Sequence, residues 1–214
     1  MARRYIKSKK KKPLIIIGSE GERGNTEKCY FGNFSSRDVR IKFSTGGSTD
    51  PKGMVDDLLK FIHNEDAKSE DYLRVFLVLD TDLKEERISE IKEIEQKCKE
   101  NNIEIITSSP TFEIWYLMHF RNNKLKFSTS KDVKRELVKV NGTYSETMNM
   151  YDKIKNQTND AKRTAQSIEQ QIIKNHEDLF KYNPHSSVYK ILDAIDEFNN
   201  LKNWNNSLYI INKI

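Results

Sequence analysis

A continuous apolar run constrains the fold of this chain more than any other feature. A strand is expected over Tyr72–Leu79, and its last five residues, Val75–Leu79, are all apolar. A strand without polar alternation suits the centre of a parallel sheet that is covered on both faces. The run within Lys12–Ser19 predicts a second buried strand. The chain is therefore expected to place helices on both faces of its sheet.

Further strands and helices alternate with these two runs. Strands are expected at Val39–Phe43 and Ile103–Thr107. Helices are expected at 26–34, after Asp50 to residue 62, at 84–101 and at 112–120. This order predicts an α/β fold made of βαβ units, with a mainly parallel sheet and right-handed crossovers. Residues 130–140, 158–180 and 186–199 are expected to be helical, and the polar stretch 141–150 is expected to be a mobile loop.

The charge divides the chain into three parts. Residues 1–12 hold seven Lys and Arg and no acid, residues 13–120 have a net charge of −7, and residues 121–214 have a net charge of +5. We expect a basic flexible tail over 1–12, an α/β core over 13–120, and a mainly helical region over 121–214 that packs on the core. An acidic centre can bind metal and basic flanks can bind phosphates, although a general solubility pattern would look the same.

The chain lacks the signals of membrane proteins and secreted proteins. No apolar run approaches the roughly 18 residues of a membrane span, and the run after the basic start is shorter than the about 7–15 residues of a secretory signal. Cys29 and Cys98 fit neither a disulfide framework nor a CxxC zinc pattern. We therefore expect a cytoplasmic protein with no membrane partner.

Acidic residues follow two of the predicted strands. Glu20 comes after the first strand, and Asp80 and Asp82 come after the third. Sites in open α/β sheets form beyond the C-terminal ends of the strands, and residues two apart on a strand face the same way. Clustered carboxylates repel each other unless a divalent cation neutralises them. The pattern favours Mg²⁺ and phosphodiester hydrolysis, while an isolated Asp-x-Asp is as often a solvated turn.

Several motifs together resemble a known family. Glu20-Gly21, Thr26-Glu27 and Asp80-Thr81-Asp82 look like the TOPRIM fold of topoisomerases, primases and OLD-type nucleases. Residues 109–120, Ser-Pro-Thr-Phe-Glu-Ile-Trp-Tyr-Leu-Met-His-Phe, resemble the PxFExWxxxHF signature of the RloB-like family, and Asn183–Tyr189 resembles its C-terminal segment. The likeness runs from about residue 13 to about residue 197.

This resemblance implies a TOPRIM-like catalytic core over 13–120 and a nuclease dependent on Mg²⁺ or Mn²⁺ that acts in anti-phage defence. Glu20 would bind metal or act as a general acid or base. Asp80 and Asp82 would bind metal, and Glu27 would be a ligand at a second site. Related sequences place the two glutamates five positions apart, whereas here they are seven apart, which makes Glu22 an alternative to Glu27.

Two other residues of the signature are candidates for the site. Glu113 lies in the first turn of its predicted helix and is the next catalytic candidate; the alternative is that it only stabilises the helix dipole. His119 lies about 120° around the helix from Glu113, so a structural role is the better expectation. Phe112 and Trp115 are expected to belong to the core rather than to stack on bases.

Candidate phosphate contacts lie further along the chain. Lys162 and Arg163 fall in a basic predicted helix and could bind a nucleic-acid backbone or stabilise charge in a transition state, although a solvated helix face is the favoured explanation for each of them singly. His185 could contact phosphate beside Ser186, whose simpler role is a helix N-cap.

Alternatives to the nuclease stay open at this stage. There is no Walker A motif, so a separate ATPase partner is implied by the resemblance alone. A non-catalytic module that binds nucleic acid or a nucleotide within a defence complex is the second reading. A primase or topoisomerase is disfavoured because 214 residues leave no room for gate domains. The choice between DNA and RNA, and whether the chain forms a homo-oligomer, are open.

Overall fold

The computed structural model describes most of the chain. It describes residues 12–20, 26–36, 38–44, 46–65, 67, 72–120 and 125–211, and the side chains as far as residue 200. No helix in this part of the chain is both long and apolar enough to cross a membrane.

A five-stranded sheet forms the centre of the fold, in the order β2-β1-β3-β4-β5. The parallel strands are β1 (Leu14–Gly18), β2 (Arg40–Ser44), β3 (Leu73–Asp80) and β4 (Ile103–Ser109). The short β5 (His185–Ser186) pairs with β4 in the antiparallel sense. The predicted α/β class with a mainly parallel sheet is confirmed. β5 was not expected, because two residues are too few to show a pattern.

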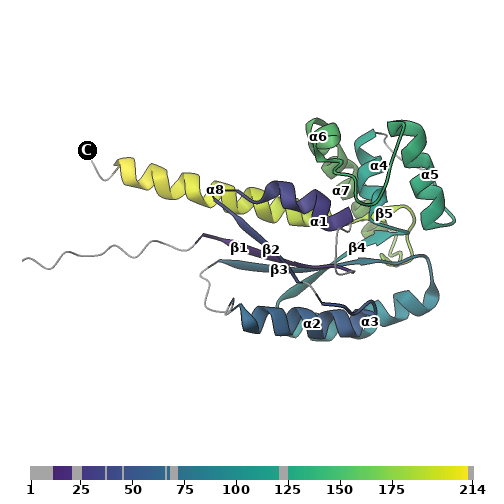
Figure 1. The fold of residues 1–214 in the computed structure, drawn as a ribbon, viewed down its shortest axis with the longest axis horizontal. Coiled ribbons are helices and arrows are strands. Elements are labelled where there is room, and N and C mark those ends of the chain that lie inside the picture. The colour runs from purple at the N-terminus through teal and green to yellow at the C-terminus, as the bar shows by residue number, and fades with distance from the viewer. Residues whose placement is uncertain are drawn as a thin grey trace, which may run out of the picture.

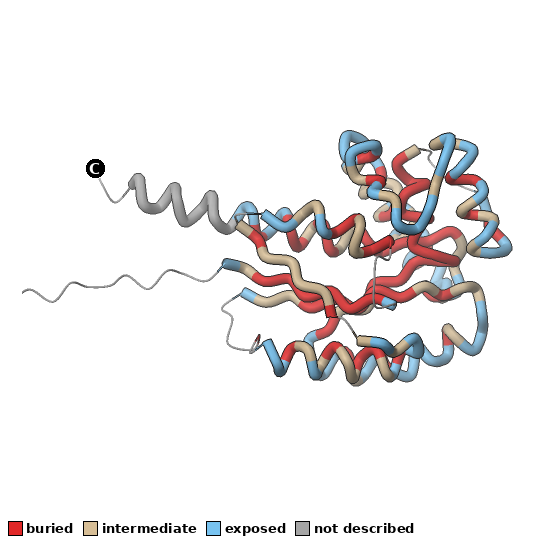
Figure 2. Tube along the Cα trace, in the orientation of Figure 1, coloured by how far each residue is buried: buried red, intermediate tan, exposed pale blue. Residues whose placement is uncertain are grey.

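Helices cover both faces of this sheet (Figure 1). On one face lie α2 (Pro51–Asn64) and α3 (Glu85–Glu100); on the other lie α1 (Thr26–Phe31), the 3₁₀ turn η1 (Gly32–Phe34), α4 (Glu113–Phe120) and α8 (Tyr189–Ile211). Alternate residues of a strand point to opposite faces. Ile16 and Leu77 therefore pack with α2 and α3, while Ile17 and Phe76 pack with the helices opposite. Both faces of the central strands are buried (Figure 2).

The C-terminal region is built of helices. They pack into the hydrophobic core that contains Ile17 and Phe76, on the sheet face opposite α2 and α3. It contains α5 (Ser130–Asn141), α6 (Tyr151–Ile154), the 3₁₀ turn η3 (Lys155–Gln157), α7 (Thr158–Lys174) and α8. Val133 of α5, Ala161 of α7 and Ile191 of α8 are buried with the strand residues. Three boundaries in this region differ from expectation by three residues or more. α7 ends at Lys174, and α8 continues to Ile211. α8 begins at Tyr189 because the residues just before it enter the sheet edge.

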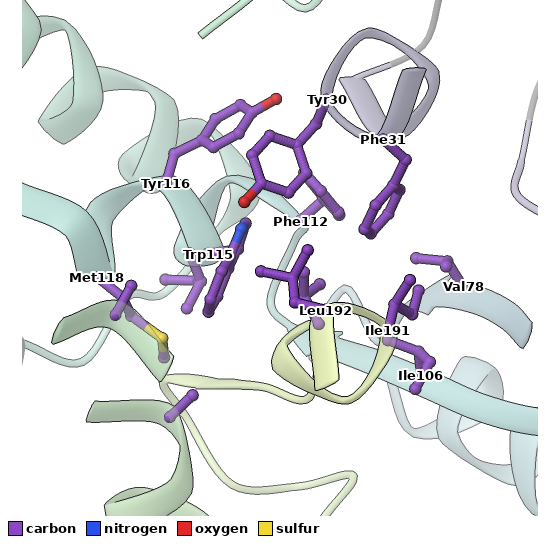
Figure 3. Close-up of a cluster of buried hydrophobic side chains, with 14 of the residues drawn as sticks. Tyr30, Phe31, Val78, Ile106, Phe112, Trp115, Tyr116, Met118, Ile191 and Leu192 are labelled. Atoms are coloured by element: carbon purple, nitrogen blue, oxygen red, sulfur yellow. The ribbon is translucent and has the colours of Figure 1, made fainter. Parts of the chain in front are cut away.

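Aromatic side chains of α1 and α4 interlock in this core (Figure 3). The rings of Phe112 and Tyr116 lie 5.5 Å apart, and Tyr30 lies 5.6 Å from Tyr116, both in edge-on geometry. Phe112 and Trp115 are almost fully buried, which confirms the expectation that they belong to the core. This cluster fixes α1 against α4, and so it fixes the residues at the N-terminal ends of both helices.

Residues 142–150 have no regular structure but are anchored along their length. Met150 is fully buried, and the side-chain amides of Asn33 and Asn149 hydrogen-bond each other. The Sγ of Cys29 contacts the carbonyl of Thr147 at 3.7 Å. This segment, expected to be a mobile loop, is thus packed against α1.

Candidate functional site

An acidic pocket of about 290 Å³ lies beyond the C-terminal ends of the parallel strands. Six carboxylates line it: Glu20, Glu27, Asp80, Asp82, Glu113 and Glu146. The structure therefore brings together the four acids expected from the strand ends and the family motifs with Glu113 of the signature. Thr81 is fully buried.

Backbone hydrogen bonds join the loops that follow β3 and β4. The amide of Thr81 donates to the carbonyl of Ser108, and the amide of Asp82 donates to the carbonyl of Pro110. Asp82 adopts a left-handed backbone conformation with φ 51°, which Asp tolerates better than most residues. These bonds place the end of β3 beside Thr111, at the start of α4.

Asp80 and Glu113 share the hydroxyl of Thr111. The Oγ1 of Thr111 lies 2.9 Å from Asp80 Oδ2 and 2.6 Å from Glu113 Oε2. A hydroxyl carries one proton, so it can donate to only one of the two carboxylates at a time. The other oxygen of Asp80, Oδ1, is buried and has no hydrogen-bond partner among the described residues. A buried carboxylate oxygen without a partner is costly.

The pocket disfavours further negative charge. Burial raises the pKa of Asp80 well above its usual value, and the charges of Glu27, Glu113 and Asp82 raise it further. Burial also raises the pKa of Glu27 to about 7, with the charges of Glu113 and Glu20 adding to the effect. Repulsion between carboxylates, which a cation relieves, is the second cause of the raised pKa in Asp80 and adds to the effect of burial in Glu27.

The C-terminal region contributes a tyrosine and a lysine to this acidic cluster. Tyr144 donates its hydroxyl to Glu113 Oε1 at 2.7 Å and lies 3.3 Å from the hydroxyl of Thr26. Lys134 of α5 lies 3.7 Å from the same Glu113 oxygen and forms an ion pair with Glu146. Burial lowers the pKa of Lys134, but Glu146, Glu113 and Asp80 raise it more, so it stays charged.

Glu20 and Asp82, which are both partly exposed, carry ion pairs. Glu20 Oε2 lies 3.2 Å from Arg87, whose guanidinium also donates to the carbonyls of Asp80 and Thr49. Asp82 accepts from the hydroxyl of Ser130 at 3.1 Å and lies 3.5 Å from Lys84. The exposed pair of Asp82 with Lys84 contributes little free energy, so it holds Asp82 only weakly. The side chain of Arg87 is only 12% exposed, and its bonds to the two carbonyls fix it beside Glu20.

The donor set suits a hard divalent cation. Among the residues that the structure describes, no three His, Cys, Asp or Glu side chains already converge as metal ligands. Mg²⁺, however, is usually held by only one or two protein carboxylates, and water and substrate complete its shell. The unpartnered Oδ1 of Asp80 fits that requirement, and it lies in the same pocket as Glu27, whose pKa is also raised.

The proposed phosphate contacts do not line this pocket. Lys162 is paired with Asp193 at 2.6 Å and Asp196 at 2.8 Å, both from α8. Arg163 is paired with Asp160 of its own helix. Arg163, which is 75% exposed, fits the alternative of a solvated helix face. Lys162 is only 15% exposed and instead joins α7 to α8.

The two histidines that the sequence analysis singled out, His119 and His185, are buried. His185 is fully buried and burial lowers its pKa to about 4, so the expectation that it contacts phosphate is wrong in this fold, where it sits in β5. The structural role expected for His119 fits its burial and its contact of 2.8 Å with the carbonyl of Trp115. Glu22 lies outside the described residues.

Sequence reasoning missed the polar partners of the carboxylates. These are Thr26 and Thr111, which were read only as parts of motifs, and Ser130, Lys134, Tyr144 and Glu146, which were not considered. Thr111 lies inside the family signature, which was the one available signal. Nothing in the local sequence marks Lys134 or Tyr144.

The comparisons with known proteins agree with the motifs. A family model described as RloB-like protein matches residues 15–195, which is most of the chain. No curated protein and no solved structure matches it. The chain therefore belongs to the RloB-like family.

Proposed function

We propose that this chain is a metal-dependent nuclease of the TOPRIM type that hydrolyses phosphodiester bonds in DNA or RNA. The observation that carries the proposal is the buried, unpartnered Oδ1 of Asp80 within a pocket of carboxylates. When bound, Mg²⁺ or Mn²⁺ supplies electrophilic stabilisation of a phosphate and activation of water. A role in defence against phage is part of the proposal by resemblance.

The chain's own residues divide the remaining work. Asp80 and Glu27 would hold the cation, and Thr111 and Tyr144 orient Glu113 beside it through hydrogen bonds. Lys134 is the cation nearest to Glu113 in the pocket, where it can offset the charge of a bound phosphate. Glu20 lies at the rim with about half of its side chain exposed, and can bind metal or exchange a proton with solvent.

Cleavage by the purified chain tests the proposal. Single-stranded DNA, duplex DNA and total tRNA are incubated with Mg²⁺ or Mn²⁺ and with wild type, Asp80→Asn or Asp178→Asn. Asp178 is the matched control, because it pairs with Lys92 away from the pocket. We expect cleavage by wild type and Asp178→Asn only. Equal product patterns from wild type and Asp80→Asn would contradict the proposal.

A non-catalytic module is the second candidate, and one observation favours it. Arg87 and Lys84 already pair with Glu20 and Asp82, as they would in a site that holds a ligand's phosphate without metal. Calorimetry with nucleotides and oligonucleotides separates the two functions, because binding without turnover supports the module. A separate ATPase, proposed by family resemblance, would be added to both assays.

A further inference from the structure

A basic groove lies beside the acidic pocket. This groove, which we call the α5 groove, has a volume of about 680 Å³ and lies between α5 and the segment 144–147. Its lining includes Lys134, Arg135, Val138, Lys139, Tyr144 and Thr147. Lys134 and Glu146, which form an ion pair, line both the groove and the acidic pocket, so the two are adjacent.

The cations of the groove are available to an anionic ligand. Arg135 and Lys139 pair with Asp132 and Glu136 on their own helix, but their side chains are 73% and 71% exposed. The pair of Arg135 with Asp132 contributes at most about 1 kcal/mol, so a phosphate can replace that carboxylate at small cost. The side chain of Glu136 is only 11% exposed, so Lys139 keeps this pair and offers its remaining ammonium donors to a phosphate. Arg135 and Lys139 form, together with Lys134, a basic edge along about one and a half turns of α5.

The lining also has an apolar part, formed by Val138 and Tyr144, beside the polar Ser145, Glu146 and Thr147. Val138 is 41% exposed, which is unusual for its type, and Tyr144 lies on the opposite side of the groove. A volume of about 300–1,000 Å³ suits a small ligand or a few linked units of a polymer. An apolar surface between cations matches sugars and unpaired bases flanked by phosphates. The bases of a duplex are stacked inside it and cannot reach such a surface.

We propose that the α5 groove binds single-stranded nucleic acid next to the phosphodiester that is cleaved in the acidic pocket. Lys134, Arg135 and Lys139 contact phosphates, while Val138 and Tyr144 contact a sugar or an unpaired base. The proposal rests on the proposed nuclease function, because it gives the groove the substrate strand of that site. It narrows the substrate class to DNA or RNA with a single-stranded stretch.

Binding without turnover tests the groove. Fluorescence anisotropy in EDTA measures the affinity for short labelled single-stranded RNA, single-stranded DNA and the matching duplexes. Arg135→Glu is compared with Arg163→Glu, its matched control: Arg163 is 75% exposed and also pairs with an aspartate three residues earlier. We expect Arg135→Glu and Lys139→Glu to weaken single-strand binding about tenfold each and to reduce the salt slope by about 0.7 per lost contact.

A second variant tests the apolar lining. Val138→Asp should weaken single-strand binding as much as the charge reversals, while circular dichroism shows unchanged folding. The proposal is overturned if wild type does not bind, if Arg163→Glu loses as much affinity as Arg135→Glu, or if duplexes bind as tightly as single strands. If the groove variants lose binding but wild type cleaves nothing, the groove proposal stands and the nuclease proposal fails. If wild type cleaves but the groove variants bind as tightly as wild type, the nuclease proposal stands and the groove proposal fails.

Discussion

Tyr144 donates its hydroxyl to Glu113 Oε1 at 2.7 Å, although 31 positions separate the two residues in the chain. The bond ties the segment after α5 to the first turn of α4. Glu113 is almost fully buried, and a buried carboxylate needs donors to offset its lost hydration. Tyr144 and Thr111 each provide one. The acidic pocket is thus completed by the C-terminal region.

Replacing Tyr144 by Phe removes this donor and keeps the ring. We expect Tyr144→Phe to lower the free energy of unfolding by about 1.5–3 kcal/mol, the usual contribution of a hydrogen bond to a charged group, and to reduce cleavage. Tyr189→Phe is the control, because the hydroxyl of Tyr189 donates to Glu169 at 2.9 Å outside the pocket. Urea unfolding in EDTA should show a lower free energy of unfolding for both variants, but cleavage should fall only for Tyr144→Phe.

Replacing Thr111 by Val removes the hydroxyl between two carboxylates without changing the side-chain shape. Asp80 and Glu113 would then face each other with one fewer donor, so Thr111→Val should be about 1–3 kcal/mol less stable at neutral pH in EDTA. Thr111→Ser retains the hydroxyl and should recover most of that loss. Chemical denaturation of the three proteins measures the difference. Equal stability of the Val and Ser variants would show that the hydroxyl is not the cause.

Asp80→Asn tests metal binding without any substrate. Divalent cations that bind only the folded chain stabilise it, by about 2.7 kcal/mol at a hundred times the dissociation constant. The melting temperature of wild type should therefore rise as Mg²⁺ or Mn²⁺ is added, and that of Asp80→Asn should not. In EDTA the variant should melt no lower than wild type, because a neutral amide relieves the repulsion that raises the pKa of Asp80. Asp178→Asn should respond to Mg²⁺ as wild type does.

His185 makes the stability of the fold sensitive to acid. Burial lowers its pKa from 6.5 to about 4, so as the pH falls the unfolded chain takes up the proton before the folded chain does. The stability contributed by the neutral, buried ring is fully present above pH 6.5 and is lost as the pH falls towards 4, by about 3 kcal/mol. His185→Asn should lack this loss.

Comparing wild type with His185→Asn isolates the contribution of His185 to the pH dependence of stability. His119 and the pocket carboxylates titrate in both proteins, so their effects cancel in the difference between the unfolding free energies. That difference should change by about 3 kcal/mol between pH 6.5 and pH 4. Parallel curves over this range would mean that His185 is not held neutral in the folded state.

The sequence by itself predicted the strands, most of the helices and the α/β class, because these depend on local periodicity. Val75–Leu79 could only be a central strand, and Asp80, at its end, had to lie at the C-terminal edge of the sheet. Glu20, which follows β1, was expected at the same edge of the sheet for the same reason, and Glu113 was a candidate because it starts α4. The two residues of β5 and the start of α8 were missed, since pairing with β4 decided them. The end of α7 at Lys174 and the length of α8 were also missed.

Only the tertiary structure decided what surrounds the carboxylates. Lys134 and Tyr144 come from a region with no recognisable motif, and they meet Glu113 because α5 and the segment after it pack against α4 and α1. His185, which has a polar side chain suited to phosphate, is instead fully buried at the sheet edge. A sequence pattern records which face of its own element a residue occupies, but contacts between distant elements depend on how their cores pack.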